Sequence, residues 1–178
     1  MKKIALLLLL PIAASLLYAQ QAAAPPSDPL SAGAKGTFNI AKNNILKSAD
    51  KMPEENYAFK PTPDVRSYGQ ILGHIADAQY LFCSAALGET NPAPGIEKSK
   101  TSKADLVKAL NDAFAYCDKA YNTMTDTHAG DMVKFFGREQ AKLSVLAFNT
   151  AHDFEHYGNL VTYLRIKGLV PPSSEQRR

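Results

Sequence analysis

The chain of 178 residues is poor in several features, and each shortage narrows the classes of protein that fit it. It has only two cysteines, and neither lies near the end of the apolar N-terminal segment, so a lipoprotein anchor is not supported. It has no basic stripe, because Arg177-Arg178 is its one basic cluster, and we therefore expect no nucleic-acid binding. No strand pair and no internal repeat is evident, which leaves helices as the expected main element.

The N-terminus has the pattern of a secretory signal peptide. Lys2 and Lys3 precede an apolar run over residues 4–17, which is shorter than the ~20 residues that a membrane-spanning helix needs. We therefore predict that residues 1–19 direct export to the periplasm or to the outside of the cell, and that the protein has no stable membrane anchor.

Cleavage of this segment is expected after Ala19, and cleavage after Ala24 is the alternative. Residues 20–29, rich in Ala, Gln and Pro, are expected to form a flexible leader. Residues 173–178 are expected to form a disordered tail.

Cys83 and Cys117 both fall on segments with helical apolar spacing. An oxidising compartment permits a disulfide between them, which would close a loop of about 35 residues and stabilise the fold by roughly 3–4 kcal/mol. The alternative is a pair of buried free thiols that pack as small apolar residues. A nucleophilic cysteine is not favoured, because neither residue has a basic neighbour in sequence.

Apolar residues at helical spacing predict four helices, over about residues 30–51, 64–87, 102–124 and 138–167. Gly88 and Gly168 are expected to end the second and fourth helices in left-handed caps, and Ser102 to begin the third. The longer connections are residues 90–100 and 125–137, the second with a short extended piece at residues 132–136. The predicted fold class is therefore all-α, a four-helix bundle over residues 30–172.

Three of the four histidines, His74, His152 and His156, predict a metal site. His152 and His156 are four residues apart, so one helix presents both on the same side. His74 lies in an earlier helix, and a bundle can hold a divalent metal between two such helices. Three protein nitrogens leave at least one coordination position open, as in catalytic or ligand-binding metal sites.

A second interpretation is a metal-free network of core histidines. The sector around His152 and His156, between Ala141 and Tyr163, has no charged side chain, which favours the metal interpretation. Asp77, three residues after His74, is expected to accept a hydrogen bond from its imidazole. His128 has the surroundings of a surface loop and is not expected to be a ligand.

Two other metal patterns fit poorly. His152-Asp153-x-x-His156 resembles the zincin motif, but Asp replaces Glu and no third ligand follows. A di-iron bundle needs two Glu-x-x-His motifs and two further glutamates, and only Asp153-x-x-His156 approximates one of these. A mononuclear site is therefore expected.

Three segments resemble the DinB superfamily of bacterial four-helix proteins: residues 61–67, residues 72–78 around His74, and residues 152–172, which begin at His152 and include His156-Tyr157-Gly158-Asn159-Leu160. The resemblance implies an up-down-down-up bundle and a divalent metal, zinc or nickel, on the three histidines. Asn159 stands where many members carry Gln. Characterised members include transferases for low-molecular-weight thiols and thiol-dependent isomerases, and members often form homodimers.

Two functions remain open. One is an exported metal-dependent enzyme, a transferase or a hydrolase, that acts on a small molecule, with Asp77, Glu155 and Tyr163 as candidates for proton transfer. The other is a non-catalytic exported bundle that binds a metal or a small ligand in stress adaptation. An enzyme needs a solvent path and a proton-transfer group beside the open coordination position.

Overall fold

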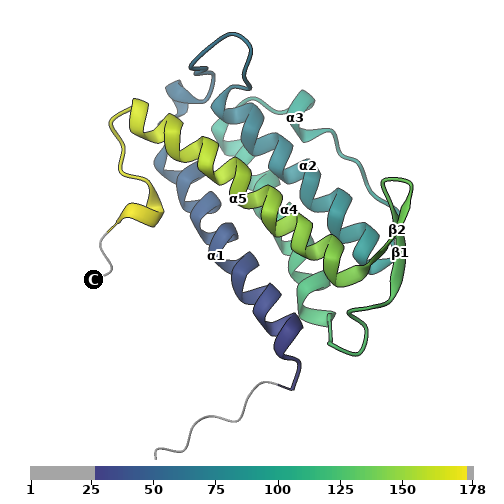
Figure 1. Cartoon of the computed structure of the whole chain (residues 1–178). Helices are drawn as coiled ribbons and strands as arrows, with labels where there is room; N and C mark the ends of the chain where they lie inside the picture. Colours follow the sequence, from purple (N-terminus) through teal and green to yellow (C-terminus); the bar gives the residue numbers. More distant parts are fainter. Residues whose placement is uncertain (1–26, 176–178) are drawn as a thin grey trace, which may run out of the picture.

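Four long helices form the predicted bundle in the computed structural model, which describes residues 27–175 (Figure 1). They are α1 (Pro29–Lys51), α2 (Tyr68–Leu87), α4 (Lys103–Thr123) and α5 (Lys142–Ile166). The smaller elements are α3 (Ile96–Ser99), strands β1 (Met132–Phe135) and β2 (Arg138–Ala141), and two 3₁₀ turns, Glu54–Asn56 and Pro172–Ser174. None of the helices in this described part has the apolar length needed to cross a lipid bilayer.

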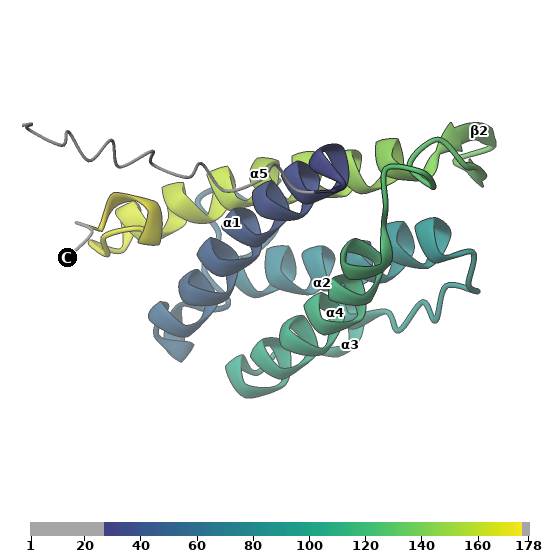
Figure 2. The same cartoon turned by 90° about the horizontal axis from the view of Figure 1, so that it is seen from below.

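The helices run up, down, down and up, as expected for the DinB-like arrangement. α1 ends beside the start of α4, because Lys103 Nζ donates to the carbonyls of Asp50 and Met52. α1 begins beside the segment after α4, where Asp126 accepts from Leu30 N and Ser31 N at 3.1 and 2.8 Å. Viewed from below, α1 packs on α5 and α2 packs on α4, so that two layers face each other (Figure 2).

Aromatic and aliphatic side chains fill the space between the layers. Phe38 of α1 stacks on Tyr121 of α4, with ring centroids 3.9 Å apart. Tyr68 at the start of α2 is fully buried, and its hydroxyl donates to the carbonyl of Ser48 at 2.7 Å. Burial of these large side chains supplies most of the driving force for folding.

α2 begins four residues later than the sequence pattern predicted. Ser67 is its N-cap, and a capping box joins Ser67 and Gln70: Gln70 N donates to Ser67 Oγ at 3.2 Å, and Ser67 N donates to Gln70 Oε1 at 2.8 Å. Pro61 and Pro63 keep the preceding segment out of the helix. The left-handed cap predicted at Gly88 is confirmed, with φ of +72°.

The predicted absence of a strand pair was wrong, and so was the start of the last helix. β1 and β2 pair as an antiparallel hairpin in which Phe135 lies opposite Arg138, which leaves Phe136 and Gly137 as a two-residue turn. Both have positive φ, +48° and +75°, as a hairpin turn of this length requires. Residues 138–141 therefore belong to β2, and α5 starts at Lys142.

Cys83 of α2 and Cys117 of α4 form a disulfide, with Cα atoms 5.2 Å apart. This resolves the two alternatives left by the sequence in favour of the cross-link. The bridge joins two helices that run in the same direction and are separated by the long connection that contains α3.

The chain ends differ slightly from the sequence-based boundaries. Residues 173–175 were expected to belong to a disordered tail, but they make ordered contacts: Ser173 N donates to Tyr157 Oη at 2.9 Å, and Lys51 contacts Glu175. α1 already includes Pro29. The predicted signal peptide, residues 1–19, lies outside the described residues.

Candidate metal centre

The three predicted histidines converge from α2 and α5. Nε2 of His152 lies 3.1 Å from Nε2 of His74 and 3.0 Å from Nε2 of His156. The nitrogens that each ring can offer to an ion all lie within 4.8 Å of one another. We call these residues the histidine cluster. Among residues 27–175, no other group of histidine, cysteine or acidic side chains has this arrangement.

The spacing of the nitrogens suits a single metal ion. Two nitrogens that are each about 2.1 Å from one ion lie about 3.0–3.4 Å apart at octahedral to tetrahedral angles. Neutral imidazole is a donor for zinc, nickel and other late first-row metals. Both distances from His152 Nε2 lie in this range, and the donor set therefore fits one divalent ion.

The surroundings keep two of these rings neutral. Burial, aided by the neighbouring His156 and His74, lowers the pKa of His152 to about 3. Burial and the nearby His74 lower the pKa of His156 to about 4. A neutral ring has a free lone pair on one nitrogen, which is the form that binds a metal.

The far nitrogens of two rings face polar side chains. His74 Nδ1 lies 3.2 Å from Glu97 Oε2, and His156 Nδ1 lies 3.4 Å from the amide of Asn159. The carboxylate of Glu97 accepts from the Nδ1–H of His74, which leaves the lone pair of that ring on Nε2, the nitrogen that a metal would use. The Asn159 contact is made by the amide nitrogen, and it orients the ring of His156. Nδ1 of His152 is buried and has no hydrogen-bond partner within the described part of the chain.

The prediction that Asp77 contacts His74 was wrong, because Glu97 has that place. Asp77 instead accepts from the backbone N–H groups of Ile96 and Glu97, at 2.8 and 3.0 Å, and so holds the first turn of α3. Sequence reasoning missed Glu97 because it treated residues 90–100 as a plain loop. The sequence feature that points to this contact is Gly73, a glycine inside an apolar helical segment.

Gly73 is required where α3 touches α2. A Cβ atom at this position would lie 2.7 Å from the Cα of Glu97 and 2.9 Å from its backbone nitrogen. Only glycine permits this approach, and it brings Glu97 within reach of the ring of His74, one residue further along α2. Gly73 and Asp77 together therefore position Glu97.

Glu97 also pairs with Arg66, whose Nε lies 2.8 Å from Glu97 Oε1. Burial raises the pKa of the Glu97 carboxyl, but the Arg66 guanidinium and His74 more than offset this and hold the pKa below its usual value. Glu97 is therefore an ionised acceptor for the His74 N–H. The carbonyl of Arg66 accepts from Tyr163 Oη at 2.6 Å, which fixes the segment before α2.

Two cavities meet the histidine cluster. The polar cavity has a volume of about 760 Å³ and touches the histidine cluster at His156. Its other lining residues include Arg66, Glu97, Glu155 and Asn159. The apolar cavity, with a volume of about 410 Å³, is lined by His74 and His152. It is bounded by α2, α5, the hairpin and the connection before α3, which contributes Asn91, Ala93 and Gly95. Phe148 and Asn159 belong to the uncharged sector of α5 that contains His152 and His156, and both are exposed at these cavities.

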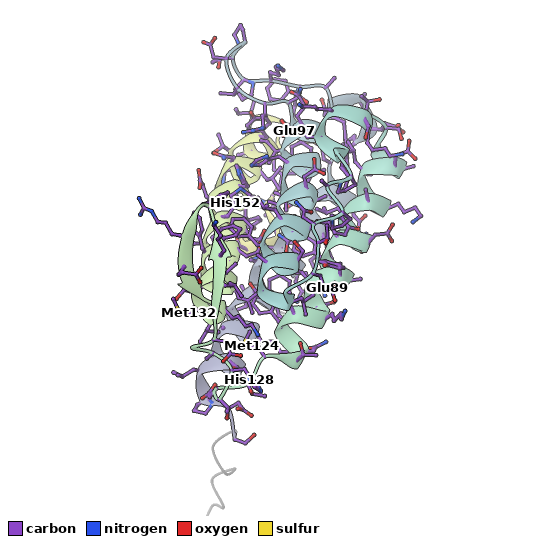
Figure 3. The ribbon with its side chains drawn as sticks, turned by 90° about the vertical axis from the view of Figure 1, so that its right-hand side faces the viewer. Glu89, Glu97, Met124, His128, Met132 and His152 are labelled. Atoms are coloured by element: carbon purple, nitrogen blue, oxygen red, sulfur yellow. A yellow bond between two sulfur atoms is a disulfide. The ribbon has the colours of Figure 1, made fainter. Side chains whose placement is uncertain are left out.

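The other residues that the sequence singled out lie in different surroundings. Glu155 lines the polar cavity, whereas the Tyr163 hydroxyl is engaged by backbone as described. His128 contacts Asp131 and lies toward the opposite end of the molecule from Glu97, as expected for a surface loop (Figure 3). Asp153 is fully buried and accepts from Gln79 at 2.6 Å, so it lines neither cavity.

The fold is a bundle of four long helices, in which α2 and α4 run in one direction and α1 and α5 in the other. A cluster of three histidines lies between α2 and α5, and these two features define the class of protein. Residues 37–160 match the DinB superfamily, and the chain belongs to that superfamily.

Individual relatives agree with this assignment. The chain is 26% identical over 145 residues to the uncharacterised protein YjoA of Bacillus subtilis strain 168, a match that covers 79% of this chain and 93% of YjoA. The crystal structure of YjoA, described as DinB-like, has a TM-score of 0.66 at 22% identity and covers 82% of this chain and 99% of its own. A DinB-like protein from Bacillus cereus has a TM-score of 0.69 at 19% identity and covers 79% and 95%. These likenesses in structure show the fold.

Proposed function

We propose that His74, His152 and His156 bind one divalent metal ion, zinc or nickel, and that the protein is an exported metal-dependent enzyme for a small-molecule substrate. The observation that carries this proposal is the convergence of three Nε2 atoms, with Nδ1 of His74 held by the carboxylate of Glu97. In a metal-free network, Nε2 of His152 would carry either one proton or one lone pair and could make one hydrogen bond, whereas it faces two Nε2 atoms.

The chain's own residues would divide the work. A divalent ion in this position acts as a Lewis acid that activates a bound water or thiol or polarises a substrate carbonyl. Glu97 holds the ring of His74 by accepting from Nδ1, and Arg66 holds Glu97. Glu155, which lines the polar cavity next to His156, is the carboxylate available to accept or return a proton. The polar cavity supplies the path for water and substrate.

Transfer to a thiol and hydrolysis both fit this arrangement, because each needs a substrate oxygen or sulfur at the open coordination position. Membership of a superfamily that includes transferases for low-molecular-weight thiols favours the first reaction class, whereas the proposed export weighs against it, because those thiols are mainly cytosolic. The two cysteines of the sequence are joined to each other, so neither is available as a nucleophile.

Export is part of the proposal. It is supported by the signal-peptide pattern of residues 1–19 and by the disulfide between Cys83 and Cys117, which is typical of an oxidising compartment. A reducing cytosol would keep such a pair as thiols.

A non-catalytic metal- or ligand-binding bundle is the second candidate. The observation that favours it is that two of the three proton-transfer candidates have structural tasks: Asp77 caps α3, and Tyr163 binds backbone. Activity that survives Glu155→Gln but is lost with the histidines would assign proton transfer to solvent. Absence of any turnover by the metal-loaded protein would favour the second candidate.

Metal content tests the site directly. The mature chain from Gln20 onward is purified and analysed by plasma mass spectrometry beside the His152→Ala, His156→Ala double variant, with His128→Ala as the matched control. We expect about one zinc or nickel per chain, lost in the double variant and retained in the control. A metal-free protein whose melting temperature is unchanged by added zinc or nickel would contradict the proposal.

A further inference from the structure

We infer that the apolar cavity is the substrate's specificity subsite, and that it takes a ring-sized apolar group attached next to the atom that binds the metal. Phe136, at the tip of the hairpin, is the residue that makes this subsite selective. The inference rests on the proposed metal site, because the histidine cluster would anchor the other part of the same small molecule.

The shape and chemistry of the cavity support a small apolar occupant. Its volume of about 410 Å³ lies within the usual range for small-molecule sites, about 300–1,000 Å³. Its one acidic lining residue, Asp77, has both carboxylate oxygens engaged by backbone N–H groups of α3, so it offers little to a charged ligand. The hydrophilic part of a substrate would be better placed in the polar cavity, where Arg66 and Glu155 lie.

An aromatic wall leads from the surface to the metal ligand. The ring of Phe82 lies edge-on to Phe148 at 5.3 Å and to Phe136 at 6.4 Å between centroids. The same Phe82 ring lies 5.6 Å from the ring of His152. An apolar group bound against these rings would therefore sit directly beside the open side of the histidine cluster.

The hairpin turn requires a positive φ at position 136, but the presence of a phenylalanine there has no local structural explanation. Its φ of +48° is in the left-handed region, which is unfavourable for a bulky side chain, and a two-residue turn of this kind prefers Asn or Gly. Its side chain nevertheless stays 64% exposed, so little burial offsets the strain. Strained residues that persist in this way cluster at ligand sites. A bound apolar group would cover Phe136 and Phe148 together, since both line the same cavity.

A pair of hydroxamates tests the subsite. Acetohydroxamate and benzohydroxamate bind zinc through the same two oxygens and differ only in the methyl or phenyl group. Their affinities for the zinc-loaded mature protein are measured by calorimetry. We expect benzohydroxamate to bind about tenfold tighter or more, because the phenyl group leaves water for the apolar cavity.

The variants identify the residues. Phe136→Asn, which suits the turn, is expected to reduce the preference to about threefold or less, to leave acetohydroxamate binding unchanged and to raise the melting temperature. Phe148→Ala should also reduce the preference. Phe154→Ala is the matched control, since Phe154 is also exposed on α5 but does not line the cavity, and it should keep the full preference.

The outcomes separate this inference from the proposed function. Equal affinity for both hydroxamates in a protein that holds one zinc per chain would overturn the subsite and leave the metal site standing. A preference unaffected by Phe136→Asn and Phe148→Ala would also overturn it. Failure to bind zinc at all would remove the proposed function, and this inference with it.

Discussion

Two groups of polar side chains lie between α2 and α5, and they differ in every property that matters for ligand binding. The histidine cluster has nitrogens that point at one another and borders two cavities. The second group, which we call the amide cluster, consists of Gln79, Tyr121, Asn149 and Asp153. Its members are buried, lie in the core and bond to each other: Gln79 accepts from Asn149 at 3.0 Å and donates to Asp153 at 2.6 Å.

The contrast shows how neighbouring positions of one helix acquire opposite roles. His152 and Asp153 are consecutive, yet a rotation of about 100° per residue takes one to the cavities and the other into the core. Burial raises the pKa of Asp153 well above its usual value, which favours a neutral carboxyl there. The histidine cluster thus borders the cavities, whereas the amide cluster joins helices within the core.

The largest expected effect concerns the disulfide beside the amide cluster, where Cys117 Sγ lies 3.6 Å from the Asn149 amide nitrogen. Replacement of both Cys83 and Cys117 by Ser is expected to lower the free energy of unfolding by about 4 kcal/mol, because the bridge closes a loop with a sequence separation of 34. Urea denaturation of the oxidised, reduced and double-variant proteins measures this. Equal midpoints in oxidised and reduced protein would show that the bridge does not stabilise the fold. Metal content of the folded variant should remain near one ion per chain.

A smaller loss of stability is expected when the amide cluster is broken. Gln79→Leu leaves Asp153 and Asn149 without their shared partner in the core, which should reduce the free energy of unfolding by about 2–4 kcal/mol. Because Gln79 does not contact the histidine rings, metal affinity should change little. Calorimetric metal titration and chemical denaturation are run on the same preparation. A loss of metal affinity as large as the loss of stability would mean that the two clusters are a single unit.

Substitutions of the residues that support the histidine cluster are expected to weaken metal binding more than they reduce stability. Glu97→Gln weakens the acceptor for His74, and Gly73→Ala forces the backbone of Glu97 away from α2, so each should weaken zinc or nickel binding by about 10–100-fold. Gly158→Ala is the matched control, because a Cβ atom there meets nothing within 4 Å, and it should leave metal affinity unchanged. Metal titration against a competing chelator measures the affinities. If Gly158→Ala and Gly73→Ala behave alike, the close approach of α3 is unimportant.

The long helices and the histidine cluster could be predicted from the sequence because each depends on a repeating local signal. Apolar spacing located the long helices, and the four-residue spacing of His152 and His156 put both on one face. His74 lies far away in the sequence, and its place in another apolar helical segment linked it to this pair. These signals are short-range or motif-based, and they do not depend on how loops pack.

The features that the sequence did not reveal depend on tertiary contacts. The hairpin strands have four residues each, too few to show alternation, and β2 continues directly into α5. Glu97 lies in a connection whose position is set by a close approach at Gly73, and a lone glycine in an apolar helix has several explanations. The partner of Asp77 could not be found from helical spacing, because it is the backbone of another element.

α2 differs from the other long helices in how firmly it is attached to its neighbours. The disulfide fastens it to α4, and a metal on the histidine cluster would fasten it to α5, so α2 would be tied on two sides by bonds stronger than side-chain packing. α1 has neither tie, and its first turn is held instead by the hydrogen bonds that Asp126 accepts. Thermal opening of the native protein would then begin at α1, and the proposed substrate site, which is built on α2 and α5, would keep its shape while that edge of the bundle loosens.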